Sequence, residues 1–155
     1  MTLPDIKSAT IKVSDTMSHN LVTVQEDDRV STAADRLISR NVGSVLVMNQ
    51  NDEVVGIITK GDIVREIVID NKDSNRIRAK EIMSSQLVTI NCNNTIEEAS
   101  SLMAQKQISK LPVLKDGNLC GIITASDIIR AHPFHVEYLE ELVHARSVSK
   151  DSKKR

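Results

Sequence analysis

Two copies of one short stretch carry the residues that could bind a ligand. The first copy is residues 56–63, GIITKGDI, and the second is residues 121–128, GIITASDI. The hydroxyl of a Thr before a helix can accept a hydrogen bond from a free backbone N–H of the first turn. An acid three residues later can accept one from the N–H of that Thr and so complete a capping pair. A helix N-terminus also attracts phosphate, and an Asp one turn inside can accept from both hydroxyls of a ribose. The stretch fits helix capping and also fits nucleotide binding. The candidate ligand-binding residues are Thr59, Asp62, Thr124 and Asp127.

The duplication favours nucleotide binding over capping alone. Seven of the ten positions in 56–65 are identical in 121–130. Arg65 and Arg130 each follow the signature Asp by three residues, so each shares a helix face with it. Each Arg can pair with that Asp or contact a phosphate, and the sequence leaves both roles open.

Each copy ends a unit with the order strand, helix, strand, strand, helix. In the first unit the expected strands are 21–24, 45–48 and 54–58, and an apolar pattern of helical period starts at Val30. A second helix is expected after Thr59. The second unit repeats this order with a hairpin turn that is one residue shorter. The turn contains Asp-Gly, which suits a tight hairpin.

The predicted fold class is α+β, with two β-α-β-β-α repeats. Repeats of about 60 residues cannot each bury a full core, so they are expected to pack about a pseudo-twofold axis and form two clefts. The predicted organisation is a 1–12 arm, a 13–70 repeat, a 71–78 linker, a 79–132 repeat, a 133–146 helix and a 147–155 disordered basic tail.

Composition narrows the class of protein. A net charge of −1 gives no overall attraction to nucleic acid. The aromatic residues are Phe134 and Tyr138, so a base-binding pocket earlier in the chain must use aliphatic side chains. Cys92 and Cys120 match no metal or redox spacing and favour a reducing compartment. No apolar run is long enough to span a bilayer, and no signal peptide is evident, so a cytoplasmic protein is expected.

The repeat resembles a tandem pair of cystathionine-β-synthase (CBS) motifs, often called a Bateman module. The resemblance covers residues 13–132 and rests on two copies of G-I-I-T-x-x-D-I in register. Each copy ends a β-α-β-β-α unit that is opened by Met-Ser and then Leu-Val-Thr. The resemblance implies a regulatory module without a cofactor that binds adenine-containing ligands in two clefts. The implied ligands are AMP, ADP and ATP, or S-adenosylmethionine.

By the same resemblance the two pockets are composite. Thr59, Lys60 and Asp62 would face a cradle from the second repeat, made of Val88, Ala99, Ile108, Ser109, Lys110, Leu111 and Pro112. Thr124 and Asp127 would face a cradle from the first repeat, made of Val22, Ala33, Val42, Gly43, Ser44 and Val45. Because Lys60 and Lys110 belong to the first pocket, that pocket is expected to bind phosphate chains more tightly.

The resulting hypothesis is a non-catalytic sensor that acts on a partner protein in trans. A homodimer is expected because the helix stripe 63–68 and the segment 136–143 are more apolar than a small domain needs. One alternative is a nucleotide hydrolase, which would need a base and a metal-holding carboxylate beyond Asp62 and Asp127. Another is a nucleic-acid binder that uses the basic tail. His132, His135 and His144 have no metal-ligand spacing, so no metal site is expected.

Overall fold

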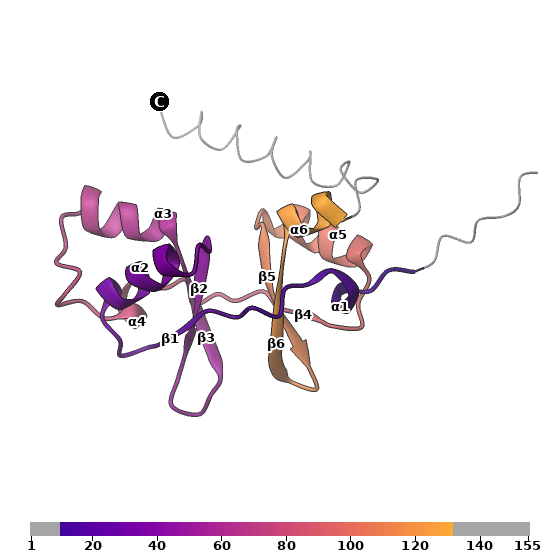
Figure 1. The fold of residues 1–155 in the computed structure, drawn as a ribbon, viewed down its shortest axis with the longest axis horizontal. Helices are drawn as coiled ribbons and strands as arrows, with labels where there is room; N and C mark the ends of the chain where they lie inside the picture. The colour runs from indigo at the N-terminus through magenta and orange to yellow at the C-terminus, as the bar shows by residue number, and fades with distance from the viewer. Residues whose placement is uncertain (1–9, 132–155) are drawn as a thin grey trace, which may run out of the picture. The chain divides into compact units, whose positions relative to one another are not determined.

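Six strands form two three-stranded sheets in the computed structural model, which describes residues 10–131 (Figure 1). The described residues divide into two compact units. Unit 1 contains residues 10–19 and 89–131, and unit 2 contains residues 20–88. The predicted helix 133–146, the predicted tail 147–155 and the first nine residues of the predicted arm lie outside the described residues.

Unit 2 is built from the first repeat. Strand β1 (Thr23–Gln25) pairs in parallel with β2 (Ser44–Met48), and β2 pairs antiparallel with β3 (Val54–Thr59). Helix α2 (Val30–Ser39) connects β1 to β2 and turns Val30, Ala33 and Leu37 into the core, as its apolar period predicts. The remaining elements are α3 (Lys60–Ile63), the π-helix η1 (Val64–Ile69) and α4 (Ala79–Ile82).

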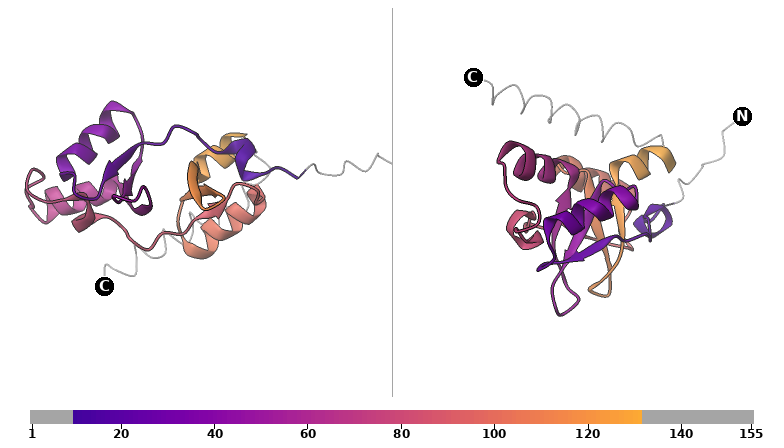
Figure 2. Two further views of the ribbon diagram at one scale, coloured as in Figure 1. Left: turned by 90° about the horizontal axis from the view of Figure 1, so that it is seen from below. Right: turned by 60° about the vertical axis from the view of Figure 1, so that its left-hand side comes forward.

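Unit 1 repeats this order with the second copy of the sequence. Its elements are α1 (Val13–Thr16), β4 (Ile90–Asn91), α5 (Ile96–Lys106), β5 (Lys110–Lys115), β6 (Asn118–Thr124) and α6 (Ala125–Ala131). Asp116 and Gly117 both have positive φ, 50° and 79°, as a two-residue hairpin requires. In each unit the hairpin turn extends away from the helices (Figure 2). The predicted α+β class and the repeated element order are confirmed.

The Met-Ser segments are exchanged between the repeats. Ser18 lies near the start of the first repeat but forms an antiparallel bridge with Ile122 of the second, through N···O distances of 2.9 and 3.0 Å. Ser84 lies near the start of the second repeat but forms the same bridge with Ile57 of the first, at 3.0 and 3.1 Å. The compact units and the sequence repeats therefore have different boundaries.

Residues 71–78, predicted as a linker, serve as the N-terminal cap of α2. The cap residue Arg29 gives α2 no side-chain hydrogen bond. Instead, the N–H of Val30 donates to the carbonyl of Ile77, and that of Ser31 donates to the carbonyl of Ser74, both at 3.0 Å. The first N–H groups of a helix have no partner within the helix, so these carbonyls satisfy them.

Each Met-Ser segment requires a glycine opposite it. A Cβ atom added to Gly56 would lie 2.3 Å from the Met83 sulfur and 2.9 Å from its Cβ atom. A Cβ atom added to Gly121 would lie 2.6 Å from the Met17 sulfur. Because the methionine covers the strand so closely, these glycines are required for packing, and their φ values are not positive.

We expect Gly56→Ala to lower the free energy of unfolding by about 1–3 kcal/mol, because an extra methyl group in a full site forces its neighbours to move. Chemical denaturation measures this change. Gly61→Ala is the control, since its new Cβ atom would have 3.7 Å to the nearest atom. This helical alanine should raise stability by about 0.5–1 kcal/mol. If Gly56→Ala destabilises equally in a Met83→Ala background, the contact with Met83 is not the reason.

Candidate functional site

Both Thr-x-x-Asp stretches form the same hydrogen-bonded turn at the end of a sheet strand. In unit 2 the N–H of Thr59 donates to Asp62 Oδ2 at 2.8 Å, and the N–H of Asp62 donates to Thr59 Oγ1 at 3.2 Å. In unit 1 the matching distances between Thr124 and Asp127 are 3.0 and 3.1 Å. The capping role considered from the sequence is therefore present in both copies.

The Arg that follows each turn differs between the copies. Arg65 Nη2 lies 2.9 Å from Asp62 Oδ1, whereas Arg130 Nη1 lies 3.9 Å from Asp127 Oδ1. The hydroxyl of Thr59 also donates to Asp62 Oδ2 at 3.0 Å. Both oxygens of Asp62 are thus engaged. An exposed ion pair contributes at most about 1 kcal/mol, so a ligand hydroxyl can replace Arg65 at little expense.

Within each unit the turn lies beside part of a predicted cradle. Ser44 pairs with Thr59 across β2 and β3, and the N–H of Lys60 donates to the carbonyl of Gly43 at 3.3 Å. In unit 1, Lys110 pairs with Thr124, and Ala125 N–H donates to the carbonyl of Ser109 at 2.9 Å. These contacts join each turn to the cradle segment of its own unit. The pairing with the other repeat's cradle, which the resemblance implies, stays a prediction.

Burial divides the predicted cradle residues into two groups. One group belongs to the core and can support the backbone beneath a ligand: Ala33, Val45, Ala99, Leu111 and Pro112. The other group is half-buried and can touch a ligand directly: Val22, Val42, Ser44, Val88, Ile108, Ser109 and Lys110. Gly43 and Lys60 are exposed. The Lys60 side chain can therefore reach a charged ligand at its turn.

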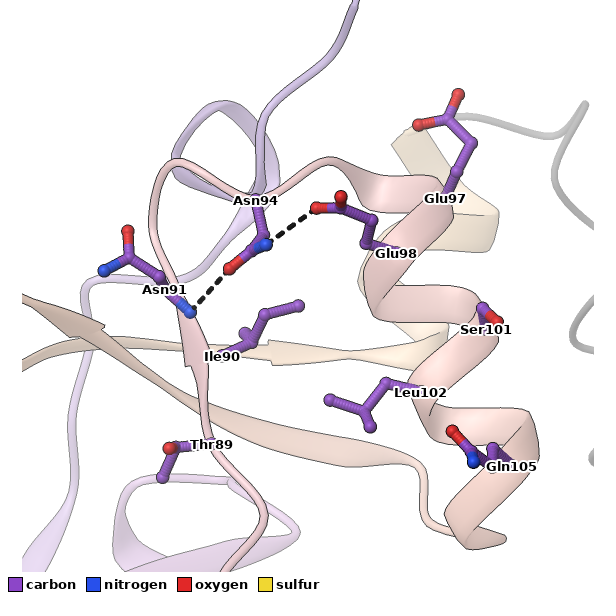
Figure 3. A pocket seen from close by; sticks show the side chains of 9 residues that line it. All are labelled: Thr89, Ile90, Asn91, Asn94, Glu97, Glu98, Ser101, Leu102 and Gln105. Atoms are coloured by element: carbon purple, nitrogen blue, oxygen red, sulfur yellow. Dashed lines mark hydrogen bonds between the residues drawn. The ribbon is translucent and has the colours of Figure 1, made fainter.

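In each unit a cavity lies between the first strand and the first long helix. In unit 1 it measures about 600 Å³, and Ile90 and Leu102 face each other across it (Figure 3). Its remaining lining is polar: Thr89, Asn91, Asn94, Glu97, Glu98, Ser101 and Gln105. The equivalent cavity of unit 2 measures about 440 Å³. Neither cavity was predicted from the sequence. Their lining residues come from separate strand and helix positions and form no motif.

Glu98 has the clearest electrostatic shift at these sites. Its Oε2 accepts a hydrogen bond from Asn94 Nδ2 at 2.7 Å (Figure 3). The same oxygen accepts from the Thr95 N–H at 2.9 Å. These bonds favour the charged carboxylate, so the Asn94 side chain, followed by the Thr95 backbone, lowers the pKa of Glu98. Glu98 is also the third helical residue after the Thr95 cap, so its charge stabilises the start of α5.

The described residues hold neither a metal cluster nor a membrane span. Within residues 10–131 no group of three His, Cys, Asp or Glu side chains could hold a metal ion. The histidines considered in the sequence analysis, His132, His135 and His144, lie outside this range. Burial raises the pKa of the Cys120 thiol, which keeps it protonated at neutral pH. No helix in the described part is long and apolar enough to cross a membrane.

Comparison with known proteins decides the family. The CBS domain matches this chain twice, at residues 13–69 and 79–133. The chain belongs to the CBS-domain family. It is a tandem CBS pair, since the two matches coincide with the two repeats of the sequence.

Relatives of this CBS pair include one named protein and two solved structures. CBS domain-containing protein YhcV of Bacillus subtilis is 35% identical over 116 residues, covering 75% of this chain and 81% of that protein. A conserved protein from Pyrococcus horikoshii has a similar fold, with a TM-score of 0.73, 30% identity, and coverage of 79% and 92%. The CBS pair of protein MJ0100, solved with 5′-methylthioadenosine and S-adenosylmethionine, gives a TM-score of 0.71, 28% identity, and coverage of 79% and 95%.

The Glu98 contacts predict an acid-sensitive contribution to the stability of the second CBS domain. Folding lowers the pKa of Glu98 from 4.5, so the stabilisation is fully present above pH 4.5 and is lost as pH falls through the folded pKa. Glu98→Gln keeps an acceptor at the cap but cannot titrate. We expect its unfolding free energy to fall less than that of the wild type below pH 4.5.

Denaturant unfolding at several pH values measures this difference. Asp116→Asn removes one carboxylate from the hairpin turn of the same unit and is the control. An unchanged acid dependence in Glu98→Gln would show that the cap contributes nothing through its charge.

Proposed function

We propose that this CBS pair senses an adenine-containing ligand and passes its occupancy to a partner protein. The observation that carries the proposal is the duplicated turn, in which Thr59–Asp62 and Thr124–Asp127 form the same hydrogen bonds. The MJ0100 pair, which was solved with two adenosine derivatives, supports the ligand class. AMP, ADP, ATP and S-adenosylmethionine are the candidate ligands.

In this proposal the Asp of each turn accepts from the ribose hydroxyls. Asp62 Oδ1 faces Arg65 in the structure, at 2.9 Å. A bound ribose would take this acceptor, and Arg65 would then be available for a phosphate of the same ligand. The exchange replaces one exposed ion pair by two charge-assisted contacts, which favours the liganded form.

The same geometry favours binding over turnover. A general base needs a free acceptor that points at the proton it removes. Asp62 instead accepts from the Thr59 N–H, the Thr59 hydroxyl and Arg65. These contacts keep the carboxylate in an orienting role, so we propose that the ligand leaves unchanged.

We predict that ATP, AMP or S-adenosylmethionine raises the melting temperature of the full chain. Ligand at 100 times its Kd should add about 2.7 kcal/mol. Asp62→Asn and Asp127→Asn should each reduce the shift, and both together should abolish it. Asp116→Asn makes the same chemical change in a hairpin turn and should leave the shift intact. A full shift in the double variant would remove the turns from the site, and sustained ATP hydrolysis lost in Asp62→Asn would show an enzyme.

We also predict that Lys60 selects for phosphate. Lys60 is exposed beside the Asp62 turn, and Ala125 occupies the equivalent position beside Asp127. An exposed charge contact contributes up to about 1 kcal/mol, or about fivefold in affinity. In calorimetry, Lys60→Ala should weaken the affinity for ATP by about that factor and leave the affinity for adenosine unchanged. Ala125→Lys is the reverse experiment and should strengthen the binding of ATP. An equal loss for adenosine would assign Lys60 a structural role.

A homodimer is the proposed assembly of this sensor. Among the described residues, the large exposed apolar side chains are Ile38, Val64, Val68, Ile69 and Ile129. Four of the five belong to α2 and η1 of unit 2, with Val68 exposed by 72% and Ile69 by 71%. Helix α3 contacts α2, and η1 continues directly from α3. A small protein seldom leaves so many apolar side chains on neighbouring helices in water.

Light scattering should therefore give a particle of twice 17.2 kDa for the wild type. Val68→Glu should shift the particle toward the monomer, because a buried charge without a partner opposes association. Asn51→Glu adds the same charge to an exposed hairpin turn and should not. A wild-type mass of 17.2 kDa at micromolar concentration would contradict the dimer.

A further inference from the structure

We infer that unit 2 holds a binding site for a phosphorylated small molecule in the cavity between β1 and the second half of α2. The cavity measures about 440 Å³, within the range of small-molecule sites. Its lining comes from the chain entering β1 and from one face of α2: Asn20, Leu21, Val22, Thr23, Asp35, Arg36, Ser39 and Arg40. None of the Thr-x-x-Asp residues lines it, and Val22 is the one residue that it shares with a predicted cradle, the cradle of Thr124 and Asp127.

Arg36 is held in place for anion binding. Its side chain is half-buried, and its Nη1 donates to the carbonyl of Thr23, so the guanidinium reaches from α2 to the edge of the sheet. A guanidinium has five N–H donors, and this contact uses one of them. The remaining donors lie on a group that the fold already orients, which reduces the entropy lost when an anion binds.

Arg36 and Arg40 lack a carboxylate partner in the part of the chain that the structure describes. None of the ion pairs found within 4.0 Å among residues 10–131 involves either of them. Arg36 is half-buried and Arg40 is exposed. A half-buried charge without a counterion is unfavourable, so an anion at Arg36, with Arg40 beside it, would be favoured. Asp35 also lines the cavity and would oppose the anion.

Unit 1 shows that the fold does not need an arginine here. Leu102 occupies the position of Arg36 in its α5, and Ser101 and Gln105 occupy those of Asp35 and Ser39. The lining of the unit 1 cavity contains Glu97 and Glu98 and no Lys or Arg. Leucine is therefore compatible with this position of the helix, so the repeated architecture does not require the charge of Arg36.

The two guanidinium groups and the hydroxyl of Ser39 define the ligand class. Guanidinium groups bind phosphate oxygens through paired N–H donors. Arg36 and Arg40 are one helical turn apart, so both can reach one phosphate or two linked phosphates. The cavity is far larger than a phosphate ion, which leaves room for the organic part of a phosphorylated metabolite.

Calorimetry on the full chain with pyrophosphate, at constant ionic strength, tests the site. Arg36→Leu copies unit 1 and should abolish binding, with the unfolding midpoint lowered by no more than the loss of one hydrogen bond to the Thr23 carbonyl explains. Arg40→Gln should weaken binding by about tenfold, the usual value of one charge-assisted hydrogen bond. Asp35→Asn should strengthen it by a few fold. Arg29→Gln removes an exposed arginine of unit 2 outside the cavity and is the matched control.

The outcomes separate this site from the proposed adenine site. Pyrophosphate binding that survives Asp62→Asn and Asp127→Asn but not Arg36→Leu supports the cavity, whether or not adenosine binds. Pyrophosphate binding that is lost in either Asp variant and kept in Arg36→Leu places the anion at a Thr-x-x-Asp turn and overturns the inference. Absence of saturable binding, or equal weakening by Arg29→Gln and Arg40→Gln, also overturns it.

Discussion

The contact between a Met-Ser segment and a glycine of the signature strand is the constraint on which both units depend. Gly56 and Gly121 can carry no side chain because Met83 and Met17 lie directly against them. The serine after each methionine then pairs with the next strand residue and covers an otherwise open sheet edge. Since each segment belongs to the opposite repeat, neither repeat completes its own sheet. Two copies are therefore the smallest number in which each sheet has its edge strand paired with a Met-Ser segment.

This constraint also determines where the Thr-x-x-Asp turns begin. Gly56 pairs with Val47, and Ile57 is held between Leu46 on one side and Ser84 on the other. With that register set, β3 ends at Thr59, opposite Ser44. The cap pair with Asp62 forms where the strand stops. A ligand at this turn, as proposed above, would act on a strand whose packing includes the exchanged segment, and this packing offers a physical route from the turn to the rest of the unit.

Local patterns in the sequence predicted the parts of the fold that depend on neighbouring residues. The apolar period of α2, the Asp116-Gly117 turn and both Thr-x-x-Asp caps are short-range features, and all are present. The exchange of Ser18 and Ser84 was not predicted, because it joins residues far apart in the chain and leaves no periodic signal. The cap of α2 by carbonyls of the 71–78 segment was missed for the same reason, since any residue can supply a carbonyl.

Comparing the two repeats separates the requirements of the fold from those of a ligand. Glycine, threonine and aspartate are the same in both signature stretches, and the structure gives each a packing or capping role. Because these positions have the same packing or capping role in both repeats, they do not distinguish one adenine ligand from another. Two equivalent positions differ in charge between the repeats. Lys60 of the first repeat corresponds to Ala125 of the second, and Arg36 corresponds to Leu102. Because both residues of each pair are compatible with the fold, we propose that these unequal positions would set the ligand preference of each unit.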